Sequence, residues 1–468
     1  MLRKSILSFL IVIVSFSLVS CKEKEDEEKT GIAPGDDLKL LDGVEFDYEN
    51  AFFDDFSNGV DPNNWYIADQ AWGGSNGGVI PENVSYTDDG ILLLRGNGGY
   101  YLEGEVAGVG DVKDGRYTGA ALISNFLTGA GRYEIKMKVL PRIGACTAFW
   151  TFAYEFDEKL NHEIDIELPG GNRSGTPTFA NILNTNYIKE SQSYSQDTNV
   201  SNILGSETYL NDGEWHTFGF DWYTNPEQII YYIDGKVCAT SDLFVPNLNS
   251  RLWVGVWFPV TSAFVGSAEF ESDYMEIDYI SYIPFKNQPN TQYNPSPNGV
   301  ASLSEYPTTP VTKDTINKVS NGTYEYVAKG KENLSGWLLK KYIFEEQELA
   351  DVCNILDGIG YENSKALFIK DGGVATQEID AVYHNFSHEL KFKAKGKGNL
   401  IINYYSNDRM MPLKTYTFEI NSEDFKDYIA ELIAPENAMV MEIKFDTSQG
   451  NSVIIDNVNL LYLGVGGR

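Results

Sequence analysis

One short segment of the chain places an acidic residue at every second position. It reads His162-Glu163-Ile164-Asp165-Ile166-Glu167-Leu168. Alternate side chains of a β-strand lie on the same face, so we expect the three carboxylates to share one face while the apolar residues between them enter a core. His162 falls on the other face and is expected to be structural. The Cα atoms of Glu163 and Glu167 would then lie roughly 13 Å apart.

A pair of carboxylates on one face suits the hydrolysis of glycosidic bonds, in which one group is the nucleophile or base and the other the acid. Repulsion among the three raises the pKa of at least one, which supplies a protonated acid near neutral pH. Asp165 would share a proton or hydrogen bond with either neighbour. The spacing does not choose between a retaining and an inverting reaction. A solvated strand face and a calcium site are alternative interpretations of the same cluster.

The rest of the chain supplies strands to hold this segment. Tyr133, Ile135, Met137 and Val139 alternate with charged residues, and residues 229–233 form an apolar run that ends at an Asp-Gly turn. Similar alternation occurs around residues 390–395. No long stretch shows sustained apolar spacing at the helical period. The fold class is therefore predicted to be all-β, of the sandwich or jelly-roll type.

The acidic segment resembles the catalytic signature of glycoside hydrolase family 16, whose members include lichenases, laminarinases and agarases. The resemblance extends over about residues 50–285, in the order of the family. The segments that carry it are Tyr117–Leu122, Gly131–Glu134, Ala148–Trp150, Glu163–Glu167, Asp212–Thr217, Asp221-Trp222, Tyr232–Gly235 and Met275–Ile280.

This resemblance implies a concanavalin-like β-jelly-roll with the acidic strand on the floor of a cleft. It implies a retaining, endo-acting hydrolase of β-linked polysaccharide, a β-glucan or β-galactan, that requires no cofactor. Glu163 would be the nucleophile, Glu167 the general acid/base and Asp165 the residue that assists them. Two alternatives remain open: a surface protein that binds glycans without cleaving them, and a transglycosylase of the same fold.

Sugar rings stack on aromatic side chains, so tryptophans near the acidic strand are candidates for substrate binding. Trp150 and Trp257 are expected in the cleft and Trp72 on a rim loop, although each could equally be a core residue. Asn184 is a candidate donor to sugar hydroxyls, or a turn residue. Asp278 matches the position of a structural calcium ligand in some family members, or is a solvated carboxylate.

The N-terminus has the pattern of a lipoprotein signal peptide. Basic residues precede an apolar run from Ile6 to Val19, which ends in Leu-Val-Ser before Cys21. This resembles a lipobox, so residues 1–20 are expected to be removed and Cys21 to be lipidated. Residues 21–44 would be a charged tether. We expect attachment to the outer membrane, with exposure at the cell surface.

Prolines recur among Asn, Gln, Ser and Thr in residues 286–318, which are expected to be a linker between domains at 45–285 and 319–468. The second domain, from Asn333–Trp337 through Gly360–Leu367 to Ile455–Val458, resembles carbohydrate-binding and galactose-binding-like β-sandwiches. It would bind glycan or act as a spacer. The net charge of −31 argues against nucleic acid as a partner. Polysaccharide and, through the lipid anchor, a membrane are the expected partners, and no protein partner is predicted.

Overall fold

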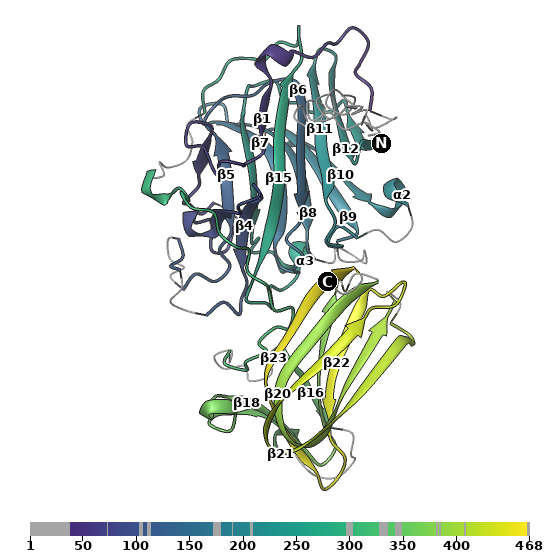
Figure 1. Ribbon diagram of the computed structural model, residues 1–468. Helices are drawn as coiled ribbons and strands as arrows, with labels where there is room; N and C mark the ends of the chain where they lie inside the picture. The colour runs from purple at the N-terminus through teal and green to yellow at the C-terminus, as the bar shows by residue number, and fades with distance from the viewer. Residues whose placement is uncertain are drawn as a thin grey trace, which may run out of the picture.

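The computed structural model describes residues 38–465, except 73, 103–105, 110–113, 172–178, 190, 206–208, 296–302, 327–335, 342–348, 381, 383–384 and 407–408. Cys21 and the predicted signal peptide lie outside the described residues. The regular secondary structure of the described chain is almost all β-strand, arranged as two β-domains, the second below the first in Figure 1. None of its helices has the length and apolar character needed to cross a membrane.

The first domain is a sandwich of two antiparallel sheets. The eight-stranded sheet has the order β13-β12-β11-β6-β15-β4-β3, and β1 also pairs with β15. Its strands are β1 (Phe52–Asp54), β3 (Val84–Tyr86), β4 (Leu92–Asn97), β6 (Gly131–Lys138), β11 (His216–Thr224), β12 (Glu227–Ile233), β13 (Lys236–Ser241) and β15 (Ser272–Pro284).

The seven-stranded sheet carries the acidic segment. Its order is β10-β9-β8-β7-β14-β5-β2. Its strands are β2 (Trp65–Ile67), β5 (Ala120–Ser124), β7 (Cys146–Glu155), β8 (Leu160–Pro169), β9 (Asn181–Lys189), β10 (Gln192–Asn199) and β14 (Arg251–Trp257). The short helices of this domain are η1 (Tyr48–Asn50), η2 (Pro81–Asn83), α2 (Ser201–Leu204) and α3 (Ser262–Val265).

The core of the first domain fills the space between the two sheets. Tyr133, Ile135 and Met137 enter it from β6, as their alternation predicts, and Ile164 and Ile166 enter it from β8. Burial of these side chains fixes which face of each strand is turned inward, since a slip by one residue would expose the whole apolar set. The opposite face of β8 is thereby assigned to the three acidic side chains.

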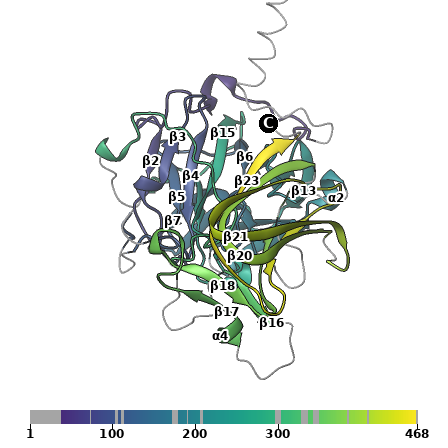
Figure 2. The same ribbon diagram turned by 60° about the horizontal axis from the view of Figure 1, so that its bottom comes forward.

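The second domain is built around a long, bent hairpin. β20 pairs with β21 along its length, with β23 through residues 386–396, and with β22 through residues 399–405. The hairpin therefore crosses from one layer of the sandwich to the other, and Figure 2 shows its curvature. Gly396 lies at this crossing with φ +102°, and a Cβ there would meet the carbonyl oxygen of Ser452 at 2.2 Å.

The remaining strands extend the two layers of the second domain in the order β16-β19-β22-β20-β23-β18-β17. The elements are β16 (Leu338–Lys341), β17 (Cys353–Leu356), β18 (Ala366–Lys370), β19 (Gly373–Asp380), β20 (Phe386–Tyr405), β21 (Pro412–Ile433), β22 (Val440–Asp446) and β23 (Ser452–Val465), with α4 (Leu349–Val352) and η4 (Tyr361–Asn363).

The described part of the proline-rich segment, including η3 (Leu303–Glu305), runs against the first domain. The Tyr306 hydroxyl donates to the carbonyl oxygen of Trp65 at 2.8 Å, and the Val311 N–H donates to that of Tyr86 at 2.8 Å. The segment therefore makes specific contacts before it enters the second domain.

A buried ion cluster joins the end of that segment to the first domain. Asp273 Oδ2 lies 2.7 Å from Arg142 Nε and 2.8 Å from Lys318 Nζ. Burial acts to raise the pKa of Asp273, but the charges of Lys318 and Arg142 lower it to about 2. Arg142 also donates to the carbonyl oxygens of Asn317 and Lys318. The second domain is thus held at a defined place on the first.

Candidate active site

The three acidic side chains lie together on the outer face of the seven-stranded sheet. Glu163 and Glu167 are partly exposed, whereas Asp165 between them is only 6% exposed. Residues directly opposite each other on neighbouring strands share a face. In β7, Phe152 faces Glu163 and Trp150 faces Asp165. We call this surface, with its carboxylates and neighbouring aromatic rings, the catalytic face.

Proton occupancy differs among the carboxyl groups. Burial is the largest cause of a pKa for Asp165 well above its usual value, and the charges of Glu163 and Glu167 add to it. Burial is also the largest cause of the raised pKa of Glu163, about 7, and hydrogen bonds from Asn161 and Asp165 keep it from rising further. Asn161 Nδ2 donates to Glu163 Oε2 at 2.9 Å. Asp165 is therefore the protonated member, and its hydroxyl donates to the Glu163 carboxylate.

Asp165 holds the proton mainly because it is buried. The repulsion among carboxylates that the sequence suggested is a smaller cause. A neutral Asp165 beside an ionised Glu163 leaves a carboxylate whose orientation is fixed by two donors. Such a carboxylate can act as a nucleophile. Glu167 lies on the same face, two residues after Asp165. Its Oε1 is 3.9 Å from the Cys146 thiol. The arrangement places a carboxylate held by two donors and a second carboxyl group on the same face.

Aromatic rings cover the side of the catalytic face beyond β7. Trp150 stacks on Trp253 of β14, with ring centroids 5.3 Å apart and an interplanar angle of 29°. Trp72 lies against Trp257 at 5.5 Å. The structure thus brings Trp72, Trp150 and Trp257 to one aromatic surface, and adds Trp253. Such surfaces suit the apolar faces of sugar rings.

Asn184 is placed differently from the expectation. It lies opposite Ile166 in β9, so its side chain is on the core side of the sheet, where it is fully buried. Its Nδ2 approaches the Cys238 thiol at 4.0 Å. The correction follows from strand parity, because only residues opposite the acidic positions share their face. Tyr187, opposite Glu163, does so instead.

Tyr187 and Asn161, like Phe152 and Trp253, are residues of the catalytic face that the sequence did not single out. Burial, with the nearby carboxylates as a smaller cause, raises the pKa of Tyr187, so its hydroxyl remains a proton donor. Asn161 precedes Glu163 by two residues and therefore shares its face. Parity alone could have found Asn161, whereas Tyr187 required the register between β8 and β9.

Two other expected residues have structural surroundings. Asp278 forms an ion pair with Lys136 at 2.7 Å. Across the described residues, no group of three or more His, Cys, Asp or Glu side chains could hold a metal ion. A calcium ion at Asp278 stays a prediction. His162 accepts hydrogen bonds at Nδ1 from the backbone N–H groups of Asn247 and Leu248, which agrees with a structural role.

A two-sheet sandwich with paired carboxylates among aromatic rings defines a carbohydrate-active protein. Comparison with known proteins specifies the class: residues 82–279 match the family described as Glycosyl hydrolases family 16. The chain carries a family 16 domain over these residues, and it is a glycosidase that hydrolyses O-glycosyl bonds. The matched range contains the whole acidic strand and ends within β15.

Individual proteins also resemble this chain. The chain is 24% identical to a beta-glucanase of Acetivibrio thermocellus over 275 residues, which cover 55% of this chain and 70% of the relative. It is 25% identical to a beta-glucanase of Paenibacillus macerans over 230 residues, which cover 47% of this chain and 82% of the relative. Among solved structures, the Bacillus licheniformis beta-glucanase aligns at 22% identity with a TM-score of 0.41, covering 50% of this chain and 99% of that chain.

Proposed function

We propose that this protein is a retaining, endo-acting hydrolase of β-linked glucan. The observation that carries the proposal is the division of roles on β8, where Asp165 holds a proton against the Glu163 carboxylate and Glu167 stands on the same face. The beta-glucanase relatives favour a glucan over a galactan as substrate.

The first step follows from these positions. The Glu163 carboxylate attacks the anomeric carbon, and a C–O ester bond forms as the glycosidic C–O bond breaks. Glu167 gives its proton to the departing sugar oxygen, so the leaving group departs as a neutral alcohol. Asp165 and Asn161 hold the attacking carboxylate in place throughout this step.

The second step reverses the roles at Glu167. Its carboxylate now accepts a proton from water as the water oxygen attacks the anomeric carbon, and Glu163 leaves as a carboxylate. Two displacements at one carbon give a product of retained configuration. All proton transfers use the carboxyl groups of the chain itself, so the reaction needs no cofactor.

Azide rescue on an aryl β-glucoside tests these assignments. Glu163→Ala removes the nucleophile, and azide added in its place should give a glycosyl azide of inverted configuration. Glu167→Ala should still form the ester with an activated phenol as leaving group, and azide should then give the retained product. NMR of the product anomeric proton distinguishes the two. Exchanged outcomes would reverse the roles. Near wild-type activity of Glu163→Ala would refute Glu163 as the nucleophile, and a wild type without activity would favour a glycan-binding protein.

A screen against soluble polysaccharides tests the substrate class. Release of oligosaccharides of several lengths from mixed-linkage β-glucan or β-1,3-glucan is the expected result for an endo-acting enzyme. Cleavage restricted to a β-galactan such as agarose would overturn the choice of glucan. Formation of longer chains from oligosaccharide donors would indicate transglycosylation.

We further propose that Cys21 anchors the protein in the outer membrane, with the domains at the cell surface. The apolar run that ends at this cysteine, followed by a charged stretch, supports the proposal. Cys21→Ala should abolish incorporation of labelled palmitate into the protein. Unchanged labelling would refute the anchor, and protease resistance of the protein on intact cells would refute surface exposure.

A further inference from the structure

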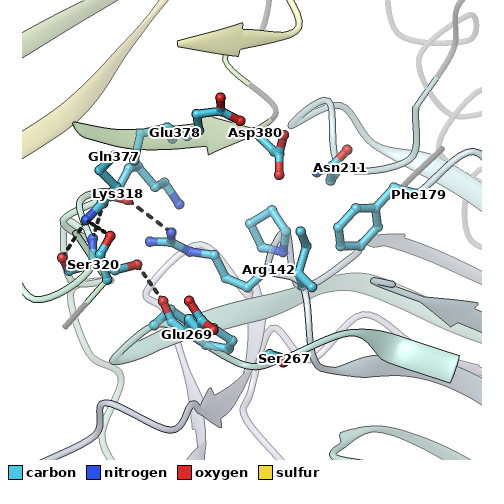
Figure 3. Close-up of a pocket in the computed structure, with 15 residues that line it drawn as sticks. Arg142, Phe179, Asn211, Ser267, Glu269, Lys318, Ser320, Gln377, Glu378 and Asp380 are labelled. Atoms are coloured by element: carbon cyan, nitrogen blue, oxygen red, sulfur yellow. Dashed lines mark hydrogen bonds between the residues drawn. The ribbon is translucent and has the colours of Figure 1, made fainter. Parts of the chain in front are cut away.

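A groove runs along the junction of the two domains. It consists of two cavities of about 300 and 370 Å³, which share Ser267 and Glu269 as lining residues. Each volume falls in the lower range of small-ligand sites. We call the two cavities together the junction groove. Figure 3 shows the first of them, with Arg142 at its centre.

Both domains supply its walls. From the second domain, Glu378 and Asp380 line the first cavity and Tyr326 lines the other. In Figure 3 the Asp380 carboxylate points into the cavity from above, beside Asn211 of the first domain. Neither domain alone would form the groove, and the buried Asp273 cluster described above keeps the two walls in register.

Tyr326 is fixed in its position. Asn321 accepts a hydrogen bond from the Tyr326 N–H at 3.0 Å and donates to its carbonyl oxygen at 2.9 Å. The Tyr326 ring lies 4.3 Å from the ring of Tyr100, and Tyr117 lines the same cavity. Tyr117 and Tyr326, both half-buried, thus present rings from two domains to one cavity, and the buried Tyr100 ring supports that of Tyr326. This prearrangement lowers the entropic cost of binding a ligand.

The groove begins next to the catalytic face. Its lining includes Asn76, Pro259 and Val260. Asn76 hydrogen-bonds through its backbone and side chain to the carbonyl oxygens of Phe258 and Pro259, which directly follow Trp257. A chain lying on the Trp72–Trp257 pair therefore needs little further length to reach the junction.

The chemistry of the lining selects a neutral ligand rich in hydroxyl groups. Aromatic rings offer stacking surfaces, and Glu269 offers a carboxylate acceptor. Glu378 and Asp380 are paired with Arg409, at 2.7 and 2.9 Å. The two cationic side chains of the first cavity, Arg142 and Lys318, are both engaged by Asp273. Among the described lining residues the charged side chains are thus largely paired already, which favours a neutral ligand over an anionic glycan.

We propose that the junction groove binds neutral hexose units of the polysaccharide, in the main chain or a side branch, beyond the units held on the catalytic face. This inference rests on the proposed function for the identity of the glycan. The second domain then acts as a wall of an extended binding site, at a fixed distance from the acidic strand.

Two substitutions test the groove without altering the catalytic face. Ser267→Trp places an indole where the two cavities meet, and Tyr326→Ala removes the aromatic wall of the second domain. Leu413→Trp, on the exposed surface of β21, is the matched control for adding a tryptophan. Tyr326→Phe keeps the ring, and thermal melting of each variant confirms that it is folded.

Two measurements are made on the full chain. The first is retardation in native gels containing soluble mixed-linkage β-glucan, with anionic carboxymethyl-cellulose as a comparison. The second is kcat/KM on that β-glucan and on a short aryl β-glucoside. Ser267→Trp and Tyr326→Ala are expected to lose about tenfold in kcat/KM on the polysaccharide, equal to roughly 1.4 kcal/mol. Their activity on the aryl glucoside should be unchanged.

The outcomes separate the groove from the catalytic proposal. Equal losses on both substrates, or no loss on the polysaccharide in either variant, would overturn the groove. Equal retardation of the wild type by carboxymethyl-cellulose and by the neutral glucan would also overturn the groove. The absence of any retardation by the neutral glucan would do the same. A different result would refute only the hydrolase proposal. In that case the wild type cleaves no glucan but is retarded by it, and Ser267→Trp is not retarded, so the groove proposal is supported.

Discussion

Replacing Asp165 tests which carboxyl group on β8 holds the proton. The Asp165 hydroxyl donates to the Glu163 carboxylate, and this hydrogen bond lowers the pKa of Glu163. Asp165→Ala removes the donor and leaves the nucleophile with Asn161 as its remaining described side-chain donor. The pKa of Glu163 is therefore expected to rise. If Asp165 were instead ionised, its removal would delete a negative charge and the pKa of Glu163 would fall.

The size of the effect follows from the strength of the lost bond. A hydrogen bond to a charged group contributes roughly 1.5–3 kcal/mol. One pKa unit corresponds to about 1.4 kcal/mol, so the pKa of Glu163 should rise by roughly one to two units. Because attack requires ionised Glu163, the acid limb of the pH profile should move to higher pH by the same amount. Asp165→Asn keeps an N–H donor, and its acid limb should lie between those of wild type and Asp165→Ala.

The assay is kcat/KM for an aryl β-glucoside from pH 4 to 9, since this parameter reports the ionisation of the free enzyme. An activated phenol as leaving group reduces the dependence on Glu167 as acid. Glu167→Ala with the same substrate is the control. Its acid limb should lie at the same pH as that of the wild type, because the limb reports the ionisation of Glu163. An acid limb that moves to lower pH in Asp165→Ala would refute the protonated state of Asp165. An unmoved limb would refute the hydrogen bond.

Three further predictions follow from the same contacts. Asn161→Ala should also move the acid limb to higher pH, because it removes the 2.9 Å donor to Glu163, and an unchanged pH profile would contradict this. Folding raises the pKa of Asp165 far above its unfolded value of about 3.9, so the contribution of Asp165 to wild-type stability should decline as pH rises above that value. Urea unfolding should show Asp165→Asn to be more stable than wild type at pH 7, and a less stable variant would argue against a buried, protonated Asp165. Asp273→Ala leaves Arg142 and Lys318 as buried charges without their partner. The substitution should lower the free energy of unfolding, measured by calorimetry, by about 3–5 kcal/mol. A loss below about 1 kcal/mol would show that the cluster does not join the domains.

The local pattern of the sequence determined the face of each strand. Alternation along residues 162–168 was sufficient to place Glu163, Asp165 and Glu167 on one side and the intervening apolar residues in the core. It also identified an all-β chain. These features follow from the two-residue period of a strand, which depends only on neighbours along the chain.

The tertiary structure decided which residues stand beside the acidic strand. Asn184 and Tyr187 belong to one strand, yet only Tyr187 shares the catalytic face, because the register of β9 against β8 sets Tyr187 opposite Glu163. Trp253 joins Trp150 through the pairing of β14 with β7, between segments about 100 residues apart. Register between distant strands is fixed by packing of the whole core, so no local pattern contains it.

Only the folded chain shows which carboxyl group holds the proton and where the second domain is attached. Asp165 is protonated mainly because burial disfavours its charge, and burial is a property of the assembled sheets. Asp273 meets Arg142, 131 residues earlier, and Lys318, 45 residues later. The composition of residues 286–318 predicted a connection between two domains, but only the folded chain shows that this connection ends in a buried ion cluster. Charges so distant in sequence become partners only when the folded chain excludes water from around them.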